Sequence, residues 1–312
     1  MIERLTLEET LLRHTRDNWI LVGRHSVWPP QPTIVIPRDN HNVEAAANDA
    51  HYQRKILPKT LPKYIANEPN PRSMVVMGIS GKAERLLNIR NVVDDQLLVV
   101  KRFSGGGTVV MDENAIWTTL IAGRKEETQE QQEQQLCKPY PREIMKWTAD
   151  AIFEPTFGIL NANAAAATSQ VLPEFSLRED DYVLTMDTKT RKMGGNAQAI
   201  VGKQGWLHHT SFLWDYEDIN MERYLKLPEK RPDYRRDRSH KDFLVKLKDY
   251  YGERGEEPSV FVEAMKEACL QNPSLRIEQT DWSIVYKEVF QNSKATMNSY
   301  WLGNNTKLDH SL

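Results

Sequence analysis

The stretch that decides how this chain folds is KRFSGGGTVV, residues 101–110, in which three consecutive glycines separate a Lys–Arg pair from two valines. Glycine weakens strands and helices because it loses more backbone freedom on folding than other residues. Backbone N–H groups without side chains can instead close around an anionic ligand, and Arg102 supplies a planar cation suited to carboxylate or phosphate. Taken alone, the glycines predict a strand bulge as well as they predict a binding loop.

A second glycine junction with a cation follows in RKMGGNAQ, residues 191–198, where Lys192 precedes Gly194 and Gly195. A lysine beside bare backbone suits acyl-phosphate chemistry. Its charge can neutralise a carboxylate that attacks an α-phosphate, and later the negative charge that develops as an acyl-adenylate collapses. Turns alone do not explain two such junctions, so the pair predicts one cleft in which Arg102 and Lys192 face the same anion.

Two further motifs carry less chemistry. GISGKAE, residues 78–84, has the wrong spacing for a phosphate-binding P-loop, and Ala83 stands where that motif needs Ser or Thr. His208 and His209 lie in a predicted strand, so their rings point to opposite faces and cannot chelate one metal together. We expect both to be structural histidines, one of them facing the cleft.

Composition excludes several function classes. The 312 residues carry a formal net charge of −2, which argues against a dedicated nucleic-acid binder. No apolar run is long enough to span a membrane, and the N-terminus looks like neither a signal nor a transit peptide. With two cysteines, Cys137 and Cys269, a reducing, cytoplasmic setting fits best. One basic stretch, residues 223–241, predicts either a solvated loop or a patch for phosphate or an acidic partner.

The order of predicted elements is that of an α+β protein with short antiparallel connections. An amphipathic N-terminal helix leads into a strand at Trp19–Val22, and residues 108–123 predict a hairpin or a bulged pair of strands. We expect a catalytic domain over residues 1–255 and a helical extension or tail over 256–312. Insertions are predicted at about 26–73, 124–137 and 160–175, the last as a loop or a short helix.

The motifs RFSGGGTVVMD, RKMGGNAQ and WLHHTSFLWD, in that order, resemble the lipoate–protein ligase branch of the biotin/lipoate ligase family. The first matches that family's Arg-x-x-Gly-Gly-Gly-x-x-x-x-Asp, ending at Asp112. The chain departs from many relatives at Met111, which replaces a histidine, and at Asp180, which replaces an asparagine. The basic loop of the biotin branch is absent, so biotin is the less favoured acid.

The resemblance implies a mixed, mainly antiparallel sheet flanked by helices, like class II synthetase cores. It implies ATP and Mg²⁺, lipoate or octanoate as the acid, and a lysine of a lipoyl domain or glycine-cleavage H protein as acceptor. Lys192 would be the electrostatic catalyst. Residues implied to bind the acyl substrate are Arg102, Ser104, Gly105, Gly106, Gly107, Thr108, Gly195, Asn196, Ala197, His208, His209 and Thr210. Those implied to bind the nucleotide are Asp112, Asp180, Asp181, Lys192, Asn196 and Gln198.

Three functions stay open at this point. The first is an ATP-dependent ligase, with a separate accessory subunit supplying the C-terminal domain that many bacterial relatives carry. The second is an acyltransferase that moves octanoyl or lipoyl groups through a thioester, for which Cys137 is the candidate near the motifs. The third is a subunit that binds lipoyl-adenylate or a lipoyl domain without turnover, against which the intact Lys192 motif speaks.

Overall fold

The computed structural model describes residues 1–14, 18–24, 33–36, 73–123, 136–167, 171–202, 205–227, 232–252, 257–273, 275, 278–280 and 300–302. The insertions predicted at 26–73 and 124–137 therefore lie mostly outside the described residues. Within the first of them, the TIVI sequence forms a strand, Thr33–Ile36.

The largest sheet has the strand order β10-β11-β6-β1-β2-β12, and its neighbouring strands are antiparallel. These strands are β1 (Asn18–Arg24), β2 (Thr33–Ile36), β6 (Ile116–Ala122), β10 (Gly194–Val201), β11 (Gly205–Phe212) and β12 (Glu278–Thr280). Successive side chains of a strand point to opposite faces, so Trp19 and Leu21 enter one hydrophobic core while Ile20 and Val22 enter another. Both faces of the central strands are therefore covered.

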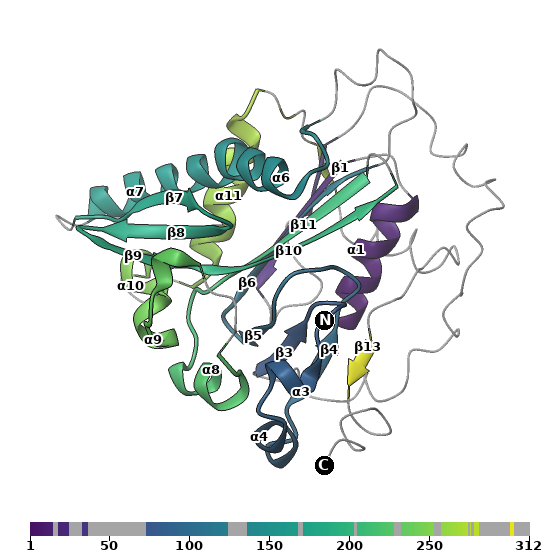
Figure 1. Ribbon diagram of the computed structural model, residues 1–312. Helices are drawn as coiled ribbons and strands as arrows, with labels where there is room; N and C mark the ends of the chain where they lie inside the picture. The colour runs from purple at the N-terminus through teal and green to yellow at the C-terminus, as the bar shows by residue number, and fades with distance from the viewer. Residues whose placement is uncertain are drawn as a thin grey trace.

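One face packs against helix α1 (Ile2–His14) and a second sheet, ordered β13-β4-β3-β5 (Figure 1). Its strands are β3 (Ser73–Met77), β4 (Leu98–Lys101), β5 (Val109–Asp112) and β13 (Tyr300–Leu302); β3 and β4 run parallel. The predicted N-terminal helix is confirmed, but residues 4–12 are all buried, so its polar side chains are enclosed with its leucines. Charged groups on this helix must consequently find partners inside the protein.

The other face is covered by α6 (Pro141–Thr148), a π-helical turn (Ala149–Phe153), α7 (Glu154–Ala167) and α11 (Ser259–Gln271), which lie together along one side in Figure 1. Pro141 suits the start of α6 because the first helical N–H needs no intrahelical partner. A third sheet, ordered β7-β8-β9, extends from this layer. It comprises β7 (Glu174–Arg178), β8 (Asp181–Met186) and β9 (Lys189–Lys192).

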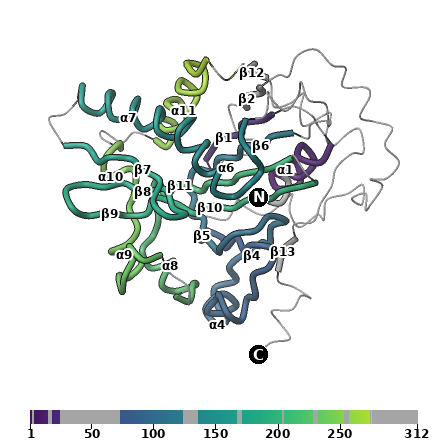
Figure 2. Tube along the Cα trace, turned by 45° about the horizontal axis from the view of Figure 1, so that its top comes forward, coloured from purple at the N-terminus to yellow at the C-terminus, as the bar shows by residue number. Residues whose placement is uncertain are grey.

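Short helices cover the remaining side of this assembly. They are α3 (Ala83–Leu86), α4 (Ile89–Asp94), α8 (Asp218–Tyr224), a 3₁₀ turn (Asp233–Arg235), α9 (His240–Phe243) and α10 (Lys248–Tyr251). In Figure 2, α8 and α9 lie across the β8–β9 hairpin from α7 and α11. No helix in the described part of the chain is long and apolar enough to cross a bilayer.

Three details differ from the sequence predictions. The strands within 108–123 do not form a hairpin, because β5 pairs with β3 in the second sheet while β6 pairs with β1 and β11 in the first. Where residues 160–175 suggested a loop or a short helix, α7 continues to Ala167. Residues 256–312, predicted as a helical extension or tail, also contribute two edge strands, β12 to the largest sheet and β13 to the second sheet.

Candidate functional site

A pocket of about 890 Å³ lies where the three sheets and the short helices meet. Gly107 and Thr108 enter it from the glycine loop, and Lys192, Gly194 and Gly195 enter it from the second motif. Its volume is in the range that small-molecule sites occupy. The two glycine motifs thus line one pocket, although the residues that do so are at least 84 positions apart in the sequence.

Backbone contact between the two motifs explains the triple glycine. The N–H of Gly105 donates to the carbonyl of Gln198 on β10. Gly106 has φ 91°, and a Cβ there would lie 2.7 Å from the carbonyl oxygen of Asn196 and 3.0 Å from the Cα of Ala197. Only glycine adopts this conformation at so short a distance from another strand. Gly107, by contrast, faces open space and the pocket.

Arg102 shapes this loop from inside. Its guanidinium donates to the carbonyls of Gly105 (2.7 Å) and Gly107 (2.8 Å), to that of Val76, and to Ser104 Oγ (3.1 Å). Burial lowers its pKa to about 10, so the group remains a cation at neutral pH. Because its N–H groups point at loop carbonyls, Arg102 does not line the pocket, and the prediction that it and Lys192 face one anion is wrong.

The second junction is a close approach of strands. A Cβ on Gly194 would meet the carbonyl oxygen of Ser211 at 2.1 Å, and one on Gly195 would meet Val109 Cγ1 at 2.5 Å. These glycines therefore let β10 lie against β11 and β5 at the floor of the pocket.

Lys192 ends β9 with its ammonium group in the pocket. Its Nζ lies 2.5 Å from Asp181 Oδ1, and the Tyr234 hydroxyl donates to Asp181 Oδ2 at 2.8 Å. The Lys192 side chain is 24% exposed and that of Asp181 is 11% exposed. The pocket thus holds a cation that solvent and a ligand can reach, backed by a nearly buried carboxylate.

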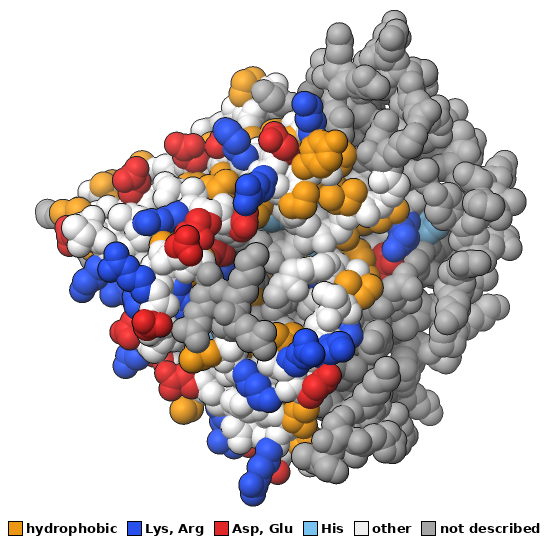
Figure 3. All heavy atoms as spheres, in the orientation of Figure 1, with side chains coloured by type: hydrophobic (Ala, Val, Ile, Leu, Met, Phe, Trp, Pro, Cys, Tyr) orange, Lys and Arg blue, Asp and Glu red, His pale blue; other side chains and the backbone are white. Residues whose placement is uncertain are grey.

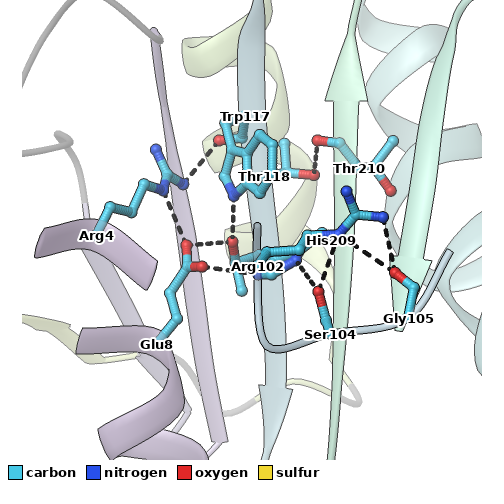
Figure 4. Close-up of polar contacts among 10 residues, drawn as sticks. Arg4, Glu8, Arg102, Ser104, Gly105, Trp117, Thr118, His209 and Thr210 are labelled. Atoms are coloured by element: carbon cyan, nitrogen blue, oxygen red, sulfur yellow. Dashed lines mark hydrogen bonds and ion pairs between the residues drawn. The ribbon is translucent and has the colours of Figure 1, made fainter. Parts of the chain in front are cut away.

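His209 belongs to a buried polar chain between α1 and the glycine loop (Figure 4). Glu8 accepts from Arg4 Nε (2.8 Å), Thr119 Oγ1 (2.5 Å) and His209 Nε2 (2.7 Å). On the other side of the ring, His209 Nδ1 lies 3.2 Å from Ser104 Oγ. A neutral His209 that donates from Nε2 to Glu8 and accepts from Ser104 satisfies every group, and burial lowers the pKa of His209 accordingly. The N-terminal helix is thereby connected to the loop that Arg102 folds.

His208 holds the second motif from the opposite face of β11. Its Nδ1 lies 3.2 Å from Gln198 Nε2, and its Nε2 lies 3.0 Å from the Tyr182 hydroxyl and 3.2 Å from Thr210 Oγ1. Thr210 in turn donates to Asn196 Oδ1. The two histidines do point to opposite faces, as predicted, and each fixes one glycine motif. Neither lines the pocket, contrary to the expectation that one would face the cleft.

Comparison with known proteins identifies the family. Residues 68–272, more than half of the chain, match the profile of the lipoyl protein ligase A/B catalytic domain. The chain belongs to this family. It is 27% identical over 214 residues to the inactive lipoate–protein ligase 2 of Plasmodium falciparum, a match that covers 63% of this chain and 53% of that protein. The lipoyl ligase domain described here thus spans about half the length of that curated relative.

A solved structure shares the fold. A bi-partite lipoate protein ligase from Thermoplasma acidophilum, studied with its E2 lipoyl domain, superposes with a TM-score of 0.51 at 12% identity, covering 93% of this chain and 87% of that one. A lipoate-protein ligase A bound with ATP gives a TM-score of 0.42 at 14% identity, covering 70% and 78%. The family match and the superposition on the Thermoplasma acidophilum ligase show that the chain has the mixed α+β fold of lipoyl ligase catalytic domains, as its sequence predicted.

Several of the remaining residues implied by the family motifs line one of two hollows. Asp180 and Asp181 line the pocket, and the hydroxyl oxygen of Thr108 is buried at its edge. Asn196, Ala197 and Gln198 line a second groove of about 500 Å³, which shares Arg142 and Asp180 with the pocket. Their contacts with a substrate stay predictions.

Asp112 lies outside both the pocket and the groove. Its Oδ2 accepts from the backbone N–H of Glu217 (2.8 Å), and its Oδ1 accepts from Asn220 Nδ2 (3.0 Å). The carboxylate that ends the family's first motif therefore fastens β5 to the start of α8, so the structure gives it an architectural place instead of the predicted nucleotide contact.

Sequence reasoning missed Gly78, Glu8 and Tyr234. A Cβ on Gly78 would lie 2.2 Å from the carbonyl oxygen of Gly106, so this glycine is required for the loop to pack. Glu8 carried a signal, since it is a charged residue among the leucines of a helix that is buried from residue 4 to residue 12. Tyr234 carried none, because it lies in a stretch dominated by basic residues.

Within the described parts of the basic stretch, residues 223–227 and 232–241, several arginines are used within the fold. Arg223 pairs with Asp95 at 2.5 Å, and Arg235 is buried, with its guanidinium carbon 4.7 Å from the centre of the Phe243 ring. On the face drawn in Figure 3, basic and acidic side chains are interspersed. Packing therefore takes up most of the Arg235 side chain, whereas Arg236 is exposed as the docking proposal from the sequence requires.

Gly106→Ala should displace the loop from β10. A side chain at φ 91° and within 3 Å of another backbone is expected to lower the free energy of unfolding by about 1–3 kcal/mol. Gly107→Ala is the matched control, since its Cβ meets nothing within 4 Å and a change of less than about 0.5 kcal/mol is expected. Urea denaturation of both variants measures this difference, and equal midpoints would contradict the close packing.

Stability should fall in mild acid because of the buried histidines. Burial, aided by His209, lowers the pKa of His208 to about 3 from 6.5. Below pH 6.5 the unfolded chain therefore binds a proton that the folded chain does not, and the stability present above that pH is progressively lost. His208 alone should cost about 2 kcal/mol between pH 6.5 and pH 5. Urea titrations across this range test the slope, which His208→Gln should reduce; a flat profile in the parent protein would show that the imidazoles are not buried neutral.

Proposed function

We propose that this chain is an ATP-dependent ligase that attaches lipoate, or octanoate, to a lysine of an acceptor lipoyl domain or glycine-cleavage H protein. The observation that carries the proposal is the position of Lys192. Its ammonium group shares one pocket with Gly107 and Thr108 of the first motif and with Gly194 and Gly195 of the second. Membership of the lipoyl ligase family supplies the substrate class.

In the first step, the carboxylate of lipoate attacks the α-phosphate of ATP, an oxygen–phosphorus bond forms, and pyrophosphate leaves with the electron pair of the broken bond. Both reacting groups are anions, so a cation between them lowers the barrier. Lys192 is the group proposed to supply this charge. The ion pair with Asp181 keeps the ammonium group in the pocket. The solvent side of that group stays open to the substrate.

The pocket has features that suit a nucleotide. Bare backbone at Gly107 and Gly195, a buried hydroxyl at Thr108, and an apolar wall that includes Val109 and Leu213 can contact an adenylate on several sides. The described residues include no group of three or more His, Cys, Asp or Glu side chains able to hold a metal alone. Mg²⁺ is proposed to enter as an ion carried by the triphosphate, and Asp180, a 67% exposed carboxylate of the pocket that lies 3.5 Å from Arg142, is the group proposed to contact it.

In the second step, the ε-amine of the acceptor lysine attacks the acyl carbon, loses a proton, and displaces AMP to leave an amide. The relative from Thermoplasma acidophilum is described as bi-partite and was studied with an E2 lipoyl domain. By analogy, we propose that an acceptor lipoyl domain meets this chain at the pocket, and that a second subunit can contribute to adenylation.

The acyltransferase alternative needs a cysteine nucleophile, and Cys137 is a poor one. Burial, together with the charge of Glu143, raises the pKa of the Cys137 thiol to about 12, so it is protonated at neutral pH. Cys269 is buried, and burial raises its pKa to about 12 as well. Both values favour the ligase over a thioester mechanism.

A non-catalytic role is the second candidate, because the curated relative from Plasmodium falciparum is named as inactive. A binding subunit would hold lipoyl-adenylate or a lipoyl domain in the same pocket without turnover. Both roles need the glycine loop, so only a measurement of enzymatic activity distinguishes a binding subunit from a ligase.

The test incubates the full chain with an acceptor lipoyl domain, ATP and Mg²⁺, and with lipoate, octanoate or biotin in turn, and follows the mass of the acceptor. A ligase adds lipoyl or octanoyl groups only when ATP is present. Acyl transfer without ATP from an octanoylated carrier protein, lost in Cys137→Ser, would instead identify the transferase. No modification, together with tight binding of a stable lipoyl-adenylate analogue, would identify the binding subunit.

A further inference from the structure

A wall of the pocket is formed by residues 232–245, and this wall is fastened to the hairpin that carries Lys192. The backbone N–H groups of Asp233 and Tyr234 donate to the two carboxylate oxygens of Glu179, at 3.2 and 3.3 Å. At the other end, the N–H of Val245 donates to the carbonyl of Lys192 at 3.0 Å. The segment is therefore tied to the turn before β8 and to the end of β9.

Tyr234 is the residue of this wall that reaches the lysine's partner. Its hydroxyl donates to Asp181 Oδ2 at 2.8 Å, while Oδ1 of the same carboxylate holds Lys192 Nζ at 2.5 Å. The ring is clamped, with the Arg178 guanidinium 5.1 Å from its centre and the Phe243 ring at 5.3 Å. A buried tyrosine with two such neighbours has little freedom to aim its hydroxyl elsewhere.

We propose that Tyr234 is a positioning residue for Lys192, acting through Asp181. This inference rests on the proposed function, in which Lys192 carries the electrostatic step. By holding one carboxylate oxygen, Tyr234 fixes the direction of the other and so selects where the lysine ammonium lies. Burial, followed by the charge of Asp181, raises the pKa of Tyr234, so its hydroxyl is a permanent donor at neutral pH.

The need for such selection follows from the other charges around the pocket. Lysine has a flexible four-carbon stem and pairs with any carboxylate in reach. Further carboxylates line the pocket, those of Glu179, Asp180 and Asp233. The cations and the histidine that line it with Lys192 are Arg142, Lys226, Arg235 and His240. Because Tyr234 holds the Asp181 carboxylate in one orientation, the Lys192 ammonium pairs with it in a single position and not with the other carboxylates of the pocket.

Tyr234→Phe removes the hydroxyl and keeps the clamped ring. We expect kcat of lipoate-dependent ATP–pyrophosphate exchange to fall about ten-fold, the value of one hydrogen bond to a charged group, while KM for lipoate and for ATP changes less than about two-fold. The control is Tyr224→Phe, because Tyr224 is also 8% exposed and donates to a carboxylate, that of Asp95, at 2.9 Å; unlike Asp181, Asp95 does not line the pocket. A kcat for Tyr234→Phe within two-fold of that control would overturn the proposal.

A second measurement does not depend on activity. Acetic anhydride labelling at fixed pH, quantified by mass spectrometry, reports how strongly each lysine is held, with exposed Lys189 of the same strand as internal reference. Lys192 should label several-fold faster in Tyr234→Phe than in the parent protein or in Tyr224→Phe. Equal rates in all three would overturn the positioning role. Faster labelling in Tyr234→Phe, with no exchange by the parent protein, would reject the ligase proposal and retain the role of Tyr234 in holding Lys192.

Discussion

Lys192→Ala is expected to abolish lipoate-dependent ATP–pyrophosphate exchange, lowering its rate at least 100-fold. The ammonium group is the cation proposed to stand between two reacting anions, and removing one such preorganised group typically costs about 3–4 kcal/mol of transition-state stabilisation. Exchange of labelled pyrophosphate into ATP measures the effect. Binding of lipoate, followed separately by calorimetry, should weaken much less.

Lys189→Ala is the matched control for this experiment. Lys189 begins the same short strand, β9, and is exposed, so its loss changes net charge equally without touching the pocket. Circular dichroism should show the same spectrum and a cooperative melt for both variants. Exchange within a few-fold of normal in a folded Lys192→Ala protein would remove the mechanism proposed for this lysine.

The second large effect concerns stability. Glu8→Gln is expected to lower the free energy of unfolding by about 3–5 kcal/mol, because it leaves the buried guanidinium of Arg4 without its counter-charge. Burial alone would raise the pKa of Glu8, but His209, Arg4 and Thr119 together lower it to about 2. The carboxylate is thus charged throughout the neutral range, and the stability it contributes is lost only as pH falls from about 4.5 towards 2.

Urea denaturation at pH 7 measures this loss, with Asp150→Asn as control. Asp150 also forms an i,i+4 ion pair, with Lys146 at 2.5 Å, but both side chains are more than half exposed, so the same carboxylate-to-amide change should cost no more than about 1 kcal/mol. If the Glu8→Gln protein were as stable as the Asp150→Asn protein, the hydrogen-bonded side chains that connect α1 to Ser104 would not be enclosed as the structure has them.

Sequence patterns predicted the part of this molecule that depends on local chemistry. Bare backbone at two glycine junctions, each beside a cation, indicated one cleft, and Gly107 and Gly195 do line one pocket with Lys192. Alternation along β11 predicted that His208 and His209 point to opposite faces, and their partners lie on opposite sides. Such inferences succeed because strand periodicity and glycine geometry hold wherever the strand is placed.

Inferences about direction and pairing failed, because they depend on contacts between distant segments. Nothing in RFSGGG distinguishes an arginine that faces a ligand from one that donates to its own loop carbonyls, as Arg102 does. The two strands around Asp112 looked like a hairpin, yet that carboxylate holds the chain to α8 as it passes from one sheet to another. Basic residues around Tyr234 suggested a docking surface, whereas tertiary packing buries Arg235.

The central claim, that this chain forms an acyl-adenylate beside Lys192, is tested most directly by ATP–pyrophosphate exchange with the full chain and no acceptor protein. Lipoate and octanoate should each support exchange, biotin should not, and a stable accessory subunit, where one exists, should raise the rate without changing this order. Absence of exchange with lipoate in the presence of such a subunit, while a lipoyl-adenylate analogue still binds, would contradict the claim.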